Sequence, residues 1–221
     1  MVTLRQIRTG LVADDFWWMA DDDLSGRPRL SDRILAIGLA GALLCELALQ
    51  GAVTIKKGDL VTTDVPPSNS LHRELCEEVK AEGPRPVRDW LDYLSLQAHE
   101  TVTRRLKDAG LVYLQQPRLK VPGRHGRWLP VDPGLASTPA ADVASKVYWG
   151  KADAHTLVLF GLTRATGLDN PSLWEIRHLL TDRGLLEQTL APLVVHNKIF
   201  RDLLLHTEAA VGSAVASQRS S

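Results

Sequence analysis

The sequence predicts a mainly α-helical single domain, built around one buried apolar helix and carrying two small β-hairpins. Residues 34–49 are apolar on every face of a helix, a pattern typical of a helix at the centre of a protein or in a membrane. The stretch carries Glu46 and falls short of the roughly 20 apolar residues that span a bilayer. Two pairs of short apolar runs flank turn residues, and helical periodicity dominates most of the remainder.

The first half of the chain is expected to combine helices with one hairpin. Ser31 or Asp32 caps the central helix, Gly51 ends it, and Asn69 or Ser70 caps the next helix. Neighbouring residues on a helix point about 100° apart, so one of Trp17 and Trp18 is expected in the core and the other partly exposed. Helices are expected over residues 11–20, 33–49, 71–81, 87–94 and 97–109, and a hairpin over 52–56 and 60–64.

The second half is expected to hold the other hairpin and a helical C-terminal third. The strands are placed at 111–115 and 127–131, joined by a basic loop, and the helices at 140–149, 154–166, 173–181 and from 185 onward. Pro192 breaks or kinks the last helix. The expected domain covers residues 1–208, and residues 209–221, which are small and polar, are expected to form a flexible tail.

Composition limits the classes of function. The 221 residues include 26 basic and 26 acidic side chains, so no global field attracts the protein to nucleic acid or to an anionic membrane. Any such attraction must come from a local patch. Cys45 and Cys76 do not make a disulfide framework, and the N-terminal residues lack the apolar stretch of a signal peptide. A cytoplasmic protein is therefore expected.

The strongest candidate site is the loop over residues 117–128. It contains Arg118, Lys120, Arg124 and Arg127, no acidic residue, and Trp128 beside them. Each cation near an anionic bilayer contributes about 1 kcal/mol, and an indole settles at the headgroup level. The alternative is a solvated hairpin tip whose Trp128 packs on the core. Weaker candidates for phosphate contact stand just before the central helix, at Arg27, Arg29 and Arg33.

The order of motifs along the chain also resembles that of a known family. The segment LAGALLCELALQG at residues 39–51 is similar to the signature helix of the Golgi phosphoprotein 3 family, preceded by LVADDFWWMADDD and followed by TDVPPSNSLHREL and RRLKDAGLV before the second hairpin. The resemblance implies a helical, non-enzymatic peripheral membrane adaptor. Eukaryotic members recognise phosphatidylinositol 4-phosphate and grip the cytosolic tails of membrane enzymes, and their hairpin takes part in membrane contact and self-association. The short loops and trimmed termini favour a bacterial member.

The resemblance does not carry over the family's headgroup residues. A Trp and three Arg that hold the phosphoinositide in eukaryotic members fall at Ser31, Ala40, Leu96 and His99. None of these side chains can make the charge-assisted phosphate contacts of Arg. We therefore expect a different anionic lipid or no headgroup specificity.

Two other classes of function are weighed against the adaptor. A helix over residues 97–109 followed by a basic wing at 117–127 is typical of a winged helix, in which Arg104, Arg105 and Lys107 would contact DNA phosphates. Neutral charge and nearby acids argue against nucleic acid as a partner. An enzyme is not expected, because the sequence has no metal-binding spacing and no Gly-rich phosphate loop. We expect no cofactor and no metal; anionic phospholipid, a protein client and a second copy of the chain are the expected partners.

Overall fold

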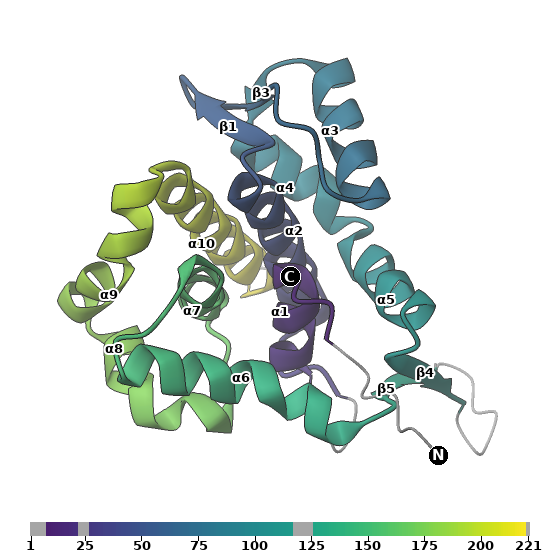
Figure 1. Ribbon diagram of the computed structural model, residues 1–221, viewed down its shortest axis with the longest axis vertical. Coiled ribbons are helices and arrows are strands. Elements are labelled where there is room, and N and C mark those ends of the chain that lie inside the picture. Colours follow the sequence, from purple (N-terminus) through teal and green to yellow (C-terminus); the bar gives the residue numbers. More distant parts are fainter. Residues whose placement is uncertain (1–7, 22–26, 117–125, 220–221) are drawn as a thin grey trace.

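The computed structural model describes residues 8–21, 27–116 and 126–219. The fold is mainly helical, with two small antiparallel sheets, as the sequence predicts. Helix α2 (Asp32–Leu49) runs through the centre of the molecule (Figure 1). Around it pack α1 (Val12–Ala20), α4 (Val87–Ser95), α5 (Ala98–Asp108), α7 (Ala154–Thr166) and α10 (Ile199–Arg219). Neighbours on several sides explain why α2 is apolar on every face.

Glycines allow the helices to approach α2 closely. A Cβ atom on Gly38 would lie 2.6 Å from the Phe16 ring of α1, and one on Gly41 would lie 2.6 Å from the Thr207 hydroxyl of α10. Both distances are shorter than van der Waals contact. The helix backbones therefore meet at a separation that any larger residue would increase.

Helix α1 is buried on every side. Trp17 and Trp18 are only 3% and 4% exposed, and their rings meet edge to face with centroids 4.9 Å apart. The expectation that one of them is partly exposed is wrong. Helix α1 is surrounded by α2, α5, α7 and α6 (Pro133–Tyr148). The side chains of Trp17 and Trp18 therefore both point into the protein, although they leave the helix in different directions.

The first hairpin joins β1 (Val53–Lys56) to β2 (Asp59–Thr62) with Thr54 opposite Val61. Lys57 and Gly58 both have positive φ, as a tight two-residue hairpin turn requires. A third short strand, β3 (Arg85–Pro86), pairs with β2 and completes a three-stranded sheet. In the sequence, α3 (Ser70–Glu82) lies between β2 and β3, and the Asn69 side chain caps its first turn.

The second hairpin pairs β4 (Val112–Gln115) with β5 (Arg127–Pro130). It follows α5 and forms an edge of the molecule away from the helices α7, α9 and α10 (Figure 1). Its register places Gln115 opposite Arg127 and Leu114 opposite Trp128. The residues that connect the two strands over 117–125 lie outside the described residues.

The C-terminal third is helical as expected, but several of its helix boundaries differ from the expectation, beginning with α6, which starts at Pro133 and not at residue 140. Pro192 lies inside α9 (Arg183–His196), and this helix ends at His196, before α10 begins at Ile199. A 3-10 helix, η1 (Pro171–Ile176), and α8 (Arg177–Thr181) precede α9. Helix α10 continues to Arg219 where we expected a flexible tail from residue 209. Its small residues Ala210, Val211 and Ala214 are buried, and small side chains favour close helix packing over fraying.

Candidate functional site

The second hairpin holds two of the five loop residues that the sequence singles out. Arg127 is exposed at the start of β5. Trp128, the next residue, is half-buried and packs against the hydrophobic core. The other three, Arg118, Lys120 and Arg124, lie outside the described residues. Trp128 therefore anchors the hairpin to the domain, while Arg127 faces solvent at the base of the loop.

The hairpin also exposes apolar side chains that sequence analysis did not single out. Tyr113 is 48% exposed, Leu114 41% and Val131 49%. On a strand with one buried face, alternate side chains turn inward, but on β4 only Val112 is buried. The sequence VYLQ does not alternate strictly between apolar and polar residues, and this pattern could have indicated that apolar side chains are exposed on β4. The described part of the hairpin thus combines exposed aromatic and aliphatic groups with Arg127.

The weaker candidates lie between α1 and α2. The Nε of Arg29 donates to the carbonyl oxygen of Asp21 at 3.2 Å, and its backbone N–H donates to Ala20 at 2.7 Å. Arg29 is thereby fixed to the end of α1 and is partly buried. Arg27 and Arg33 are exposed at the entry to α2. These contacts give Arg29 a role in fixing the turn.

The four positions aligned with the family's headgroup residues provide no cationic cluster. Ala40 is fully buried in α2, and Leu96 is 84% exposed at the end of α4. Ser31 and His99 lie on the surface. Desolvation lowers the pKa of His99, against the opposing charge of nearby Asp32. A neutral imidazole beside a carboxylate disfavours a phosphate at this place.

A network of buried charges fastens α1 to the central helix. The Oε1 atom of Glu46 accepts a 2.6 Å hydrogen bond from the backbone N–H of Ala13, in the first turn of α1. Its Oε2 atom lies 2.6 Å from His72 Nε2 on α3. Arg105 of α5 donates to both Glu46 oxygens at 3.0 Å and, through Nε, to Asp14 at 2.7 Å. Four helices therefore meet at a charged centre within the core.

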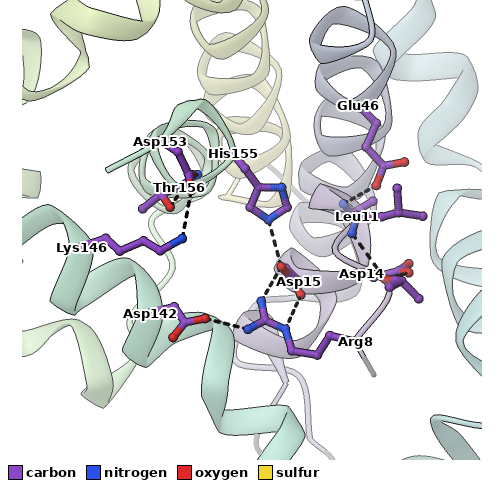
Figure 2. A network of polar contacts seen from close by, with 12 residues as sticks. Arg8, Leu11, Asp14, Asp15, Glu46, Asp142, Lys146, Asp153, His155 and Thr156 are labelled. Atoms are coloured by element: carbon purple, nitrogen blue, oxygen red, sulfur yellow. Dashed lines mark hydrogen bonds and ion pairs between the residues drawn. The ribbon is translucent and has the colours of Figure 1, made fainter. Parts of the chain in front are cut away.

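A second part of the network joins α1 to the C-terminal half (Figure 2). Asp15, 1% exposed, accepts from Arg8 at 2.6 Å and lies 2.9 Å from His155 Nε2 on α7. Arg8 also donates to Asp142 of α6 at 2.7 Å. Since Asp14 and Asp15 are adjacent and point to opposite partners, α1 is held from both sides.

Burial and the network shift two of these carboxyl groups in opposite directions. Desolvation raises the pKa of Asp14 to about 6, although Arg105 and Thr9 oppose the shift. Desolvation alone would raise the pKa of Glu46, but the hydrogen bond from His72 and the charge of Arg105 lower it below its ordinary value. The partners of Glu46 therefore outweigh the effect of desolvation on its carboxylate, whereas those of Asp14 offset it only in part. Every carboxylate of the network has a partner, and these paired charges hold the helices in position.

The network also determines which charged side chains of α5 are exposed to solvent. Arg105, which the winged-helix alternative assigned to DNA phosphates, is only 15% exposed and is engaged by two carboxylates. Four charged residues of α5 are exposed, two basic and two acidic, so their net charge is zero: Arg104, Lys107, Glu100 and Asp108. This helix therefore lacks the basic face that DNA binding needs.

On the opposite side from the hairpin, a groove of about 520 Å³ lies between α7, α9 and α10. Its lining includes Leu186, Leu190 and Leu204, with the 3.0 Å ion pair of Arg164 and Glu208 among the charged residues. Figure 1 places these helices away from β4 and β5.

Among the residues that the structure describes, His, Cys, Asp and Glu nowhere gather in a group of three suited to a metal ion. Within the same residues, no helix has the length and apolarity needed to cross a membrane.

These features define a mainly helical domain with a charged centre and a β-hairpin at its edge. A comparison with family models matches residues 12–203 to Golgi phosphoprotein 3 (GPP34), and the chain belongs to this family. The family is one of non-catalytic adaptors. A search of curated proteins found no match to the chain.

Proposed function

We propose that this protein is a non-enzymatic peripheral membrane adaptor that docks on anionic phospholipid through the second hairpin. The observation that carries the proposal is the composition of the hairpin: a loop with Arg118, Lys120 and Arg124, continued by exposed Arg127 and flanked by exposed Tyr113 and Leu114. Cations attract anionic headgroups, and aromatic and aliphatic side chains settle at the membrane interface.

The expected affinity is modest. At about 1 kcal/mol for each cation near the surface, the four basic residues contribute roughly 4 kcal/mol. Tyr113 and Leu114 are 48% and 41% exposed, so their insertion adds roughly 2 kcal/mol. Such values give reversible attachment, which suits an adaptor that cycles between membrane and solution. With neutral or apolar residues at three of the four family headgroup positions and a neutral imidazole at the fourth, the lipid is selected by charge more than by headgroup shape.

An adaptor needs a second face for its client. When the hairpin contacts a membrane, the groove between α7, α9 and α10 on the opposite side stays open to a protein partner. A cytoplasmic location and self-association through the hairpin belong to the same proposal, because the exposed apolar side chains of β4 suit a second copy of the chain as well as a lipid surface.

Co-sedimentation with liposomes tests this proposal. Vesicles of graded anionic content, one series with phosphatidylinositol 4-phosphate, are compared for the wild type and for Arg124→Glu/Arg127→Glu. A matched control is Arg177→Glu/Arg183→Glu, which makes the same charge change at exposed positions on α8 and α9. We expect binding to rise with anionic content, to collapse in the hairpin variant and to persist in the control. Absence of binding by folded wild type at low salt, or equal loss in both variants, contradicts the proposal.

A further inference from the structure

A small pocket between α3 and α4 combines acidic and aromatic side chains. It has a volume of about 230 Å³ and lies beside β3, at the end of the molecule away from the second hairpin (Figure 1). Helix α3 contributes carboxylates, and α4 contributes two aromatic rings and a further carboxylate. The charged and aromatic lining residues are Glu78, Glu82, Arg85, Asp89, Trp90 and Tyr93.

Two polar atoms of this pocket lack hydrogen-bond partners. Trp90 is only 3% exposed, and its indole N–H finds no acceptor among the described residues. Glu78 is half-buried, but its Oε2 atom is covered by protein and finds no donor there. A buried polar group without a hydrogen-bond partner destabilises the fold. A ligand that offers an acceptor to Trp90 and a donor to Glu78 would satisfy both atoms.

The acidic lining of the pocket indicates that the hydrogen-bond donor of the ligand is positively charged. Glu82 forms an ion pair with Arg85, whereas Glu78 and Asp89 have no ion pair among the described residues. Burial, together with the neighbouring charge of Glu74, raises the pKa of Glu78. The pocket therefore has an excess of negative charge that a cationic donor would neutralise.

The aromatic rings favour an organic cation over a metal ion. Tyr93 meets Trp90 edge to face, with centroids 5.8 Å apart, and is itself 45% exposed. The faces of Trp and Tyr attract ammonium and guanidinium groups. An aromatic wall also suits the alkyl chain that such a cation carries.

We propose that this pocket binds a small organic cation of the alkylammonium or guanidinium type that carries a nearby carbonyl oxygen. The cation donates to Glu78 and lies close to Asp89, while the oxygen accepts the hydrogen bond of the Trp90 indole. The pocket shares no residue with the hairpin, so this site and the membrane-docking proposal stand or fall separately.

Nuclear magnetic resonance of the indole groups tests the site directly. The chain has six tryptophans, and the Trp90 N–H signal of the full-length protein is assigned by its loss in Trp90→Phe. The first probe is Nα-acetylarginine amide; the second, Nα-acetylcitrulline amide, has nearly the same shape without the charge. We expect the arginine probe to shift the Trp90 signal saturably at millimolar concentration, and the citrulline probe to bind at least about tenfold more weakly.

Two variants on one helix separate the pocket from general surface charge. Glu78→Gln removes a pocket carboxylate and is expected to weaken binding of the arginine probe by about tenfold. Glu77→Gln changes the adjacent, exposed carboxylate and is expected to leave binding unchanged. The other indole signals report whether each variant is folded. An unmoved Trp90 signal, equal binding of both probes, or equal effects of the two variants overturns the proposal and leaves water as the occupant.

Discussion

Replacing Arg105 with methionine is expected to cost about 3–5 kcal/mol of unfolding free energy at pH 8. The substitution keeps most of the aliphatic length of the side chain but removes the guanidinium that contacts Glu46 and Asp14 at 2.7–3.0 Å. Both carboxylates are at most 2% exposed. Removing one partner of a buried ion pair leaves an uncompensated buried charge, and the estimate is the usual size of that penalty.

The cost should fall as the solution becomes more acidic. Asp14 has a pKa of about 6 even with Arg105 present, and without the guanidinium its proton is held more tightly still. A proton on Asp14 replaces the lost counter-charge, so the variant recovers stability relative to the wild type on going from pH 8 to pH 5. Glu46, whose pKa is lowered, remains ionised over this interval in the wild type.

Urea unfolding followed by circular dichroism at pH 8 and pH 5 measures both effects. Arg104→Met is the matched control, since Arg104 is the exposed neighbour on the same helix, and its effect should stay within about 0.5 kcal/mol. A loss below about 1 kcal/mol for Arg105→Met at pH 8, or a loss that grows on acidification, would refute the reasoning.

Three further predictions concern the core. The folded-state pKa of Asp14 is raised from 3.8 to about 6, so its contribution to stability is complete below about pH 4 and is lost, by up to about 3 kcal/mol, as the pH rises from about 4 through 6. Asp14→Asn should remove this slope from unfolding free energies measured between about pH 4 and 7. Gly41→Ala places a methyl group 2.6 Å from the Thr207 hydroxyl and should lower unfolding free energy by about 1–3 kcal/mol in the same assay. Burial raises the pKa of the Cys45 thiol, so mass spectrometry after iodoacetamide treatment should find Cys45 unmodified in the folded protein and modified in urea.

Local sequence patterns predicted most of the fold. The apolar surface of α2 on every side required neighbours on every side, and the structure provides them. The cap at Asn69 and the positive-φ stop at Gly51 follow from local backbone chemistry. Patterns of this kind depend on the residue and its near neighbours, which is why they can be interpreted without the fold.

The charged centre could not be assembled from sequence alone. A carboxylate at Glu46 within an apolar helix signals that buried partners exist, but the partners come from α3 and α5, far along the chain. Arg105 looked like a surface cation because nothing in its helix distinguishes it from Arg104. The burial of both Trp17 and Trp18 likewise depends on which helices surround α1, which is a tertiary property.

The packing of α10 on α2 has a consequence for biosynthesis. About 150 residues separate the end of α2 from the start of α10, so the ribosome needs roughly 8–30 s to supply the helix that covers this face. During that time the nascent chain presents an apolar helix without its full cover. Holding chaperones are therefore expected to act on this protein before α10 emerges, and a stop codon placed after residue 198 should yield insoluble product.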